Sequence, residues 1–184
     1  MKYYWHEQPV TYDGTQLSSL FAYRNYSIQG DSIIGFRGNC HVRVEEMVDL
    51  ADVKEAAFIY STDMVHFIIE MFVLDLEKSI LNQRLFVAIV KETIEEYVPT
   101  KVIRSGDDLY IEGKKLSVSI ATLSPVSSMI HFGINVSSLD TPVPTLGLED
   151  LGINPSEFAN VIMKRYVDEL DSIYMAKCKV RGVI

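Results

Sequence analysis

The chain has 184 residues, of which 48% are hydrophobic and 23% are charged, a balance that excludes disordered and fibrous classes. Its length suits one core rather than two, so we expect a single domain over residues 1–184. The formal net charge of −8 argues against a nucleic-acid partner, because nucleic-acid binders need clustered cations.

The cysteines and the apolar segments give no sign of secretion, a metal or a membrane span. The two cysteines, Cys40 and Cys178, are too few for a disulfide framework, and no Cys-x-x-Cys or His-x-x-x-His spacing suggests a metal site. The N-terminus lacks the apolar centre of a signal peptide. The most apolar run, residues 64–74, is well short of the roughly 20 residues that span a bilayer. We therefore expect a cytoplasmic protein with no membrane partner.

Residues 1–39 predict an aromatic-rich lead-in followed by a strand. A short helix around residues 17–24 and an aromatic-rich strand are alternative predictions for the lead-in. A strand over residues 32–38 is expected to end in a polar loop that contains Arg37, Gly38 and Asn39. In one interpretation, Arg37 and free backbone amides of this loop bind a phosphate or a carboxylate. In the other interpretation, Gly38 has no binding role and is needed only because the exit from the strand requires backbone angles that glycine adopts readily.

The middle of the chain predicts helix, strand and helix. Composition favours a short helix over residues 49–57. Residues 64–74 read as a buried strand, in which we interpret His66 as a buried, hydrogen-bonded histidine rather than a ligand or a base. Asp75 as a cap and Pro99 just beyond the end delimit a helix over residues 75–97.

Residues 106–136 have the most ordered pattern in the sequence. The acidic pair Asp107-Asp108 precedes a short apolar run, a turn at Glu112-Gly113 and a long alternating run, which together predict a hairpin. A second alternating run follows a break at Ser124-Pro125, so each run has one apolar and one polar face. The apolar positions are Leu116, Val118, Ile120, Ile130, Phe132 and Ile134.

If the two runs pair with their apolar faces aligned, one surface carries Lys115, Ser117, Ser119, His131, Gly133 and Asn135. This surface has two interpretations. An antiparallel sheet with one face in water needs no function. A ligand-binding floor is favoured by a single cation among small hydroxyls, an amide, an imidazole and a glycine, because small side chains leave room for a ligand.

The C-terminal part predicts a loop and a last helix. Residues 137–152 contain prolines and glycines without a long periodic run, which indicates a surface loop suited to act as a lid. Asn154 as a cap, Pro155 at the first position and Glu157 at the third predict a helix over residues 154–176. The order of elements predicts an α+β fold with a mostly antiparallel or mixed sheet and helices packed on one face.

Three segments resemble known proteins. Residues 107–117, DDLYIEGKKLS, are similar to a segment of biotin and lipoate protein ligases in which an Asn-Asp pair precedes a strand, a Gly-Arg-Lys turn and an Ile/Leu-Ser/Ala-Gly step. Residues 133–136, GINV, resemble the Gly-Ile-Asn-Val strand of biotin ligases. Together with residues 36–42, FRGNCHV, the chain resembles a mainly archaeal family, domain of unknown function 366, which is grouped with that ligase superfamily.

The resemblance implies an adenylate-forming fold in which a lysine contacts the carboxylate and phosphate of an acyl adenylate. On this alignment the implied catalytic residues are Lys115 and its acidic partner Asp108. ATP with Mg²⁺ is the implied cofactor, and a small carboxylic acid or a nucleotide is the implied partner. The candidate ligand-binding residues are Arg37, Gly38, Asn39, Ser117, Ser119, His131, Gly133 and Asn135.

Two features depart from the ligase pattern. Val118 stands where the ligases carry a glycine, and the Arg- and Gly-rich phosphate loop is reduced to Arg37-Gly38. Two functions are therefore expected. One is an enzyme that activates or transfers a small carboxylic acid through an acyl adenylate, and the other is a non-catalytic binding module that retains the pocket. A homodimer is expected only from the general frequency of such assemblies.

Overall fold

The structure, a computed structural model, describes residues 1–55, 59–139, 141 and 143–183. Within these residues, five strands form a sheet in the order β1-β2-β3-β8-β7, and three short strands form a second sheet in the order β4-β5-β6. β1 is parallel to β2, whereas the other neighbouring strands are antiparallel. The strands are β1 (Lys2–His6), β2 (Ser32–Val42), β3 (Ile59–Met71), β4 (Ile103–Ser105), β5 (Asp108–Ile111), β6 (Lys114–Lys115), β7 (Ser117–Leu123) and β8 (Ser128–Asn135).

The two long helices begin where the capping signals place them. The helices are α1 (Phe21–Tyr26), α2 (Leu50–Glu55), α3 (Leu76–Tyr97) and α4 (Pro155–Lys177), with a 3-10 turn η1 at Val44–Glu46. Asp75 Oδ1 accepts the N–H of Lys78 at 2.9 Å, and Asn154 Oδ1 accepts the N–H groups of Ser156 and Glu157, both at 3.1 Å. The two predicted long helices are therefore confirmed. Residues 56–57 of the predicted helix over residues 49–57 lie outside the described residues.

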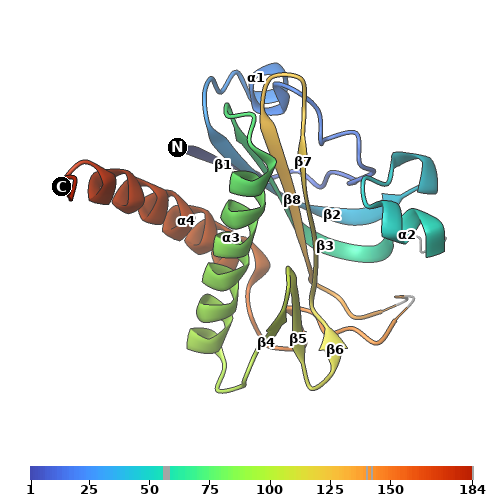
Figure 1. Cartoon of the computed structure of the whole chain (residues 1–184). Helices are drawn as coiled ribbons and strands as arrows, with labels where there is room; N and C mark the ends of the chain where they lie inside the picture. The colour runs from blue at the N-terminus through green and yellow to red at the C-terminus, as the bar shows by residue number, and fades with distance from the viewer. Residues whose placement is uncertain (56–58, 140, 142, 184) are drawn as a thin grey trace.

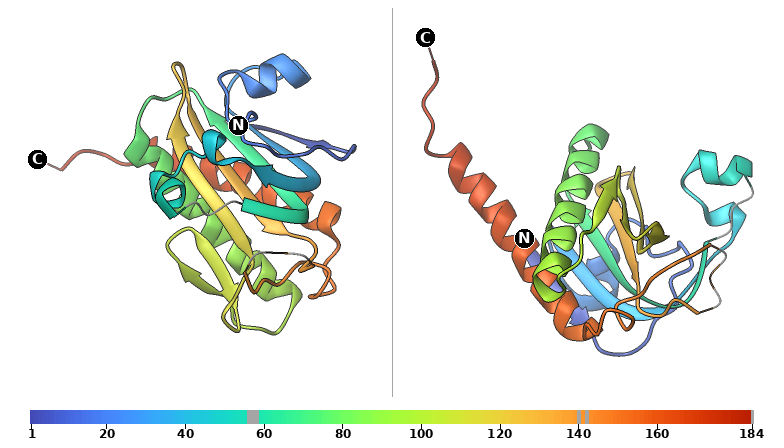
Figure 2. Two further views of the ribbon diagram at one scale, coloured as in Figure 1. Left: turned by 90° about the vertical axis from the view of Figure 1, so that its right-hand side faces the viewer. Right: turned by 90° about the horizontal axis from the view of Figure 1, so that it is seen from below.

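The two long helices, α3 and α4, pack on one face of the large sheet (Figure 1), which confirms the predicted α+β fold. The main core lies between the two long helices and the large sheet. It contains the residues of β3 and β8 that face the helices: Val65, Phe67, Ile69, Ile130, Phe132 and Ile134. A smaller cluster covers part of the opposite face with Phe21 of α1 and Tyr12 of the lead-in. The C-terminal half of α4 extends away from the sheet (Figure 2), and no helix of the described residues is long and apolar enough to cross a membrane.

The pairing of β7 with β8 differs from the predicted alignment of apolar faces. Ser117 lies opposite Ile134 and Ser119 opposite Phe132, so these serines share the face covered by the helices. Val118 and Ile120 lie on the other face, opposite Gly133 and His131. The prediction that Val118 and Ile120 pack beneath the helices was therefore wrong, because directly opposed residues share one face of an antiparallel pair.

The pairing of β7 differs from the predicted one because of the backbone at Leu116, the residue between β6 and β7. Its N–H donates to Leu109 O at 2.8 Å in the small sheet, whereas its carbonyl accepts the N–H of Asn135 at 2.9 Å in the large one. The chain changes sheets at this residue, so the alternation loses its phase as it does at a β-bulge. Leu116 and Ser117 are consecutive, yet both are buried.

Candidate functional site

A cavity of about 300 Å³ opens on the sheet face opposite the two long helices. Its floor comes from β3, β7 and β8, one end from the β5–β6 hairpin, and its rim from residues between Val42 and Asp49 and from Thr141, Val143 and Thr145. Its lining includes Tyr12, Met64, Asp107, Asp108, Lys115, Val118, Ile120, His131, Asn135 and Thr145. The cavity is large enough for a small molecule, which suits a binding site.

Lys115 and Asp108 form an ion pair at one end of this cavity. Lys115 Nζ lies 2.9 Å from Asp108 Oδ2, and the two side chains are 29% and 25% exposed. The β5–β6 turn brings them together, because Glu112 and Gly113 both have the positive φ of a two-residue hairpin turn. An ammonium has three donors, so Lys115 keeps donors for a second anion while Asp108 orients it.

Residues 144–146, within the segment predicted as a loop, hold the backbone of Lys115. Lys115 N–H donates to Pro144 O at 3.0 Å, and Lys115 O accepts the N–H of Leu146 at 3.1 Å. Asn135 Nδ2 also donates to Lys115 O at 3.4 Å. Thr145 therefore lies beside the ion pair as part of the cavity rim.

Asp107, next to the ion pair, is fixed from helix α3. Gln83 Nε2 donates to Asp107 Oδ2 at 2.8 Å and to Ser119 Oγ at 2.7 Å, and Arg84 Nη1 lies 3.1 Å from Asp107 Oδ1. Burial raises the pKa of Asp107, against the lowering effect of the Arg84 guanidinium. Sequence patterns did not single out Gln83, because an amide on a helix face gives no sign of a partner on another strand.

Two buried histidines lie beneath the other end of the cavity. His66 Nδ1 is 3.1 Å from His131 Nε2, and His66 Nε2 is 3.2 Å from the carbonyl oxygen of Gly38. The ring of Tyr12 stacks on His131 with centroids 3.6 Å apart. His66 is thus a buried, hydrogen-bonded histidine, as its place in an apolar strand predicted. Burial lowers the pKa of His66 to about 3 and holds that of His131 well below its usual range.

The stability of the protein should therefore fall as the pH is lowered below 6.5. His66 stays neutral in the folded state down to about pH 3, whereas it gains a proton near pH 6.5 when unfolded. The unfolded state then binds more protons, which costs about 1.4 kcal/mol of stability per pH unit across that window. Urea unfolding of the wild type and His66→Gln at pH 7 and pH 5 should give a smaller pH effect in the variant. His41→Gln, at an exposed position, is the control and should keep the full effect.

The structure brings six of the predicted site residues to the cavity and leaves four outside its lining. The six are Asp108, Lys115, His131 and Asn135, together with Ser117 and Ser119, which border the cavity although they lie on the helix-covered face of β7. The hydroxyls of the two serines are already engaged: Ser117 Oγ accepts the N–H of Leu109, and Ser119 Oγ donates to His131 O. The four outside the lining are Arg37, Gly38, Asn39 and Gly133.

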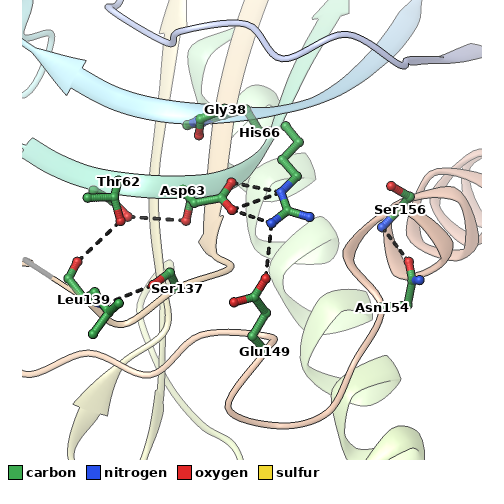
Figure 3. A network of polar contacts seen from close by, with 11 residues as sticks. Gly38, Thr62, Asp63, His66, Ser137, Leu139, Glu149, Asn154 and Ser156 are labelled. Carbon is green, nitrogen blue, oxygen red and sulfur yellow. Dashed lines mark hydrogen bonds and ion pairs between the residues drawn. The ribbon is translucent and has the colours of Figure 1, made fainter.

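Arg37 points away from the cavity and forms ion pairs. Its guanidinium binds both carboxylate oxygens of Asp63, and Nη2 lies 3.2 Å from Glu149 Oε1. Figure 3 shows the carboxylates of Asp63 and Glu149 turned toward the same group. The expectation that Arg37 shares a cavity with Lys115 was wrong, because Arg37 lies opposite Val65 in the β2–β3 pair and so projects on the helix-covered face.

Gly38 and Asn39 belong to a continuing strand rather than to a loop. β2 runs on to Val42, with an irregularity between Gly38 and Cys40. A Cβ on Gly38 would lie 2.0 Å from Val10 O, so glycine is needed for the close crossing of the lead-in segment. Asn39 Oδ1 accepts the hydroxyl of Thr11 at 2.7 Å. Both residues thus hold the lead-in segment that carries Tyr12.

Arg37→Ala should lower the free energy of unfolding by about 1 kcal/mol and leave ligand binding at the cavity unchanged. The variant loses a bidentate, half-exposed ion pair, and such pairs contribute modestly to stability. Urea unfolding and calorimetric titration with a carboxylic acid measure the two effects. Arg24→Ala, which loses only a hydrogen bond to Ser18 Oγ, is the matched control. A large loss of ligand affinity in Arg37→Ala would show that Arg37 does contribute to ligand binding.

A family model matches nearly the whole chain. The model of "Domain of unknown function (DUF366)" matches residues 1–181. The chain belongs to this family. DUF366 relatives include an uncharacterized protein of Methanocaldococcus jannaschii, 45% identical over 171 residues that cover 89% of this chain and 77% of the relative. A solved protein of unknown function from Pyrococcus horikoshi is 41% identical and has a TM-score of 0.92, with 99% of this chain and 100% of that chain covered.

Solved ligases share the fold of this DUF366 protein at low identity. A biotin protein ligase from Aquifex aeolicus, solved with biotin and ATP, has a TM-score of 0.61 at 17% identity, covering 92% of this chain and 70% of the ligase. A putative lipoate protein ligase from T. acidophilum has a TM-score of 0.62 at 16% identity, and the match covers 92% of this chain and 85% of the ligase. The predicted resemblance to biotin and lipoate ligases is confirmed for the fold.

The described lining residues of the cavity carry one cation and several acidic side chains. Among them, Lys115 is the single Lys or Arg, whereas four are acidic: Glu46, Asp49, Asp107 and Asp108. No group of three or more His, Cys, Asp or Glu among the described residues is arranged to hold a metal ion. One ammonium with donors to spare suits one carboxylate.

Proposed function

We propose that this protein binds a small carboxylic acid in the cavity, with the carboxylate on Lys115. The observation that carries the proposal is the Lys115–Asp108 ion pair at one end of the cavity. Asp108 holds the ammonium in place, and Asn135 and Thr145 add polar groups beside it. Val118, Ile120 and Met64 then offer apolar contact to the body of the acid.

Charge complementarity supports an acid rather than its neutral derivative. A hydrogen bond from an ammonium to a carboxylate is roughly twice as strong as a neutral one. The half-buried position of Lys115, at 29% exposure, reduces the screening of this contact by water. An amide in place of the carboxylate would keep the shape and lose the charge.

The second candidate function is activation of the acid as an acyl adenylate. The Lys115–Asp108 pair and the fold shared with biotin and lipoate ligases favour it. In such a reaction Lys115 would hold the carboxylate and the phosphate together and stabilise the charge that develops on the phosphate. The ion pair of Arg37 with Asp63 removes the guanidinium expected for a phosphate loop, which favours the binding function instead.

Calorimetric titration separates these functions. Lipoate and biotin are titrated with and without ATP and Mg²⁺, and their primary amides are the matched controls. The binding function predicts saturable binding of at least one acid and about tenfold or more weaker binding of its amide. The enzyme predicts, in addition, ATP binding with a defined stoichiometry and acid-dependent exchange of pyrophosphate into ATP. Equal affinity for acid and amide would contradict the assignment of Lys115.

A further inference from the structure

The apolar stripe of helix α4 continues beyond the sheet that the helix covers. The fully buried members of the stripe are Phe158, Ile162 and Tyr166. Leu170 follows and is half-buried. Ile173 and Tyr174 continue the same side of the helix, three and four residues further on, and are 47% and 59% exposed. Residues 171–177 are all exposed, and the last turns of α4 project away from the sheet (Figure 2).

The stability of the helix does not require this exposed part of the stripe. Ile and Tyr lose side-chain freedom in a helix, so an exposed helix end gains nothing from Ile173 and Tyr174 by propensity. Single exposed apolar residues are ordinary on a protein surface, whereas an ordered group of them marks a contact surface. Met175 is also exposed but projects from the other side of α4, since two residues turn a helix by about 200°. The contact surface is therefore the side that carries Leu170, Ile173 and Tyr174.

The charged residues around this surface change sign along the chain. Acidic residues come before the exposed apolar pair, and basic residues come after it. In chain order they are Asp168, Glu169, Asp171, Lys177, Lys179 and Arg181. Asp168 already pairs with Lys164, and Asp171 lies 3.7 Å from the amino group of Met1. Glu169 and Lys177 are both exposed, so their charges are open to a partner.

This sequence of charges makes the end of α4 complementary to a second copy of itself. In an antiparallel pair with a two-fold axis between Ile173 and Tyr174, Leu170 of one copy lies opposite Lys177 of the other. The ammonium of Lys177 then lies one residue from Glu169 of the second copy. The acidic part of each helix faces the basic part of the other, and the apolar residues meet at the axis. Two-fold dimers of this self-complementary kind are the commonest homo-oligomers.

A lipid surface fits the end of α4 less well than a second copy does. An interfacial helix carries cations beside its apolar face, because anionic lipids attract them. Glu169 and Asp171 lie about 100° to either side of Leu170 around the helix, so anions flank the apolar stripe. Anionic headgroups would repel these carboxylates, whereas Lys177 of a second copy attracts them.

We propose that the protein forms a two-fold dimer in which the exposed ends of two α4 helices pack antiparallel. Leu170, Ile173 and Tyr174 of both copies form the apolar centre of this interface. Lys177 of each copy pairs with Glu169 of the other at its edges. The cavity lies on the sheet face opposite α4, so the dimer leaves the cavity accessible and does not depend on the proposed function.

Sedimentation velocity tests the apolar centre of the interface. The wild type should sediment with twice the chain mass of 20.9 kDa, about 42 kDa, in a series from about 1 to 100 μM. Ile173→Glu should raise the dissociation constant about hundredfold or more, because it places two unpaired carboxylates beside the axis. Met175→Glu adds the same charge on the other side of α4 and is the matched control, with less than about twofold change. A monomeric wild type across the series, or equal effects of the two variants, would overturn the proposal.

Exchange of the two charges tests the antiparallel arrangement. Lys177→Glu and Glu169→Lys should each weaken the dimer about tenfold, because like charges then face each other in both symmetric pairs. An equimolar mixture of the two variants should regain the wild-type affinity, since both ion pairs re-form in the mixed dimer with their signs exchanged. A mixture that dimerises no better than either variant alone would contradict the arrangement. Sedimentation of a monomeric wild type with vesicles of phosphatidylcholine and phosphatidylserine would assign the surface to a membrane instead.

Discussion

Lys115→Ala is expected to weaken acid binding at the cavity by about ten- to hundredfold without unfolding the protein. The variant removes the single Lys or Arg among the described lining residues, and loss of a charge-assisted hydrogen bond costs about 1.5 to 3 kcal/mol of binding free energy. If the protein forms an acyl adenylate, the rate should fall about 10²- to 10³-fold, the effect of removing a preorganised donor from a developing charge. Calorimetry with the acid and an exchange assay with labelled pyrophosphate measure the two quantities.

Lys114→Ala is the matched control for this prediction. Lys114 is the neighbouring residue of the same short strand, but it is exposed and does not line the cavity. Its removal takes away the same charge from the protein and should change affinity by less than about twofold, since exposed charges are screened by water and salt. Thermal unfolding should stay close to wild type for both variants. Similar losses of affinity in the two variants would show that net charge, rather than the position of Lys115, controls binding.

Phe132→Ala is expected to cause the largest loss of stability among the changes considered. Phe132 is fully buried between the sheet and the long helices, and its ring centroid lies 5.3 Å from that of Phe86 and 6.3 Å from that of Phe67. Phe-to-Ala changes in such cores cost about 3 to 5 kcal/mol through lost burial and the cavity left behind. Urea unfolding monitored by circular dichroism should show this loss.

Ile120→Ala provides a contrast that depends on the observed register. Ile120 is half-buried and faces the ligand cavity, so its removal enlarges an existing space and should cost less than about 1.5 kcal/mol. The alternation in the sequence, taken alone, predicts that Ile120 and Phe132 lie on the same apolar face and are buried alike. Equal losses of stability in the two variants would contradict the pairing of Ile120 with His131. The same variant should weaken binding of an acid with an apolar body.

The capping signals and the alternation within each strand could be read from the sequence because they are local. Asp75 and Asn154 bond to N–H groups two or three residues away, so the helix starts were predictable. In β8, side chains alternate between the core and the cavity face as the pattern indicated. The resemblance of residues 107–117 to a ligase segment also selected Lys115 and Asp108, which the fold places 2.9 Å apart.

Contacts between distant segments could not be predicted in this way. The sequence shows Arg37 beside a glycine but not Asp63 or Glu149, which lie 26 and 112 residues further along the chain. His66 and His131 are 65 residues apart and each has an apolar neighbourhood of its own, so neither pattern indicates a hydrogen-bonded pair. Gln83 and Tyr12 are likewise brought to the site by packing alone.

The sequence by itself determined the elements and the face on which each strand residue can lie, since backbone geometry fixes periods of 3.6 and 2 residues. The tertiary structure decided which faces meet. The change of sheets at Leu116 shifted β7 by one position, which turned Ser117 and Ser119 toward the helices and Val118 and Ile120 toward the cavity. A shift of one residue exchanges the two faces of a strand, and its energy depends on partners that lie far away in sequence.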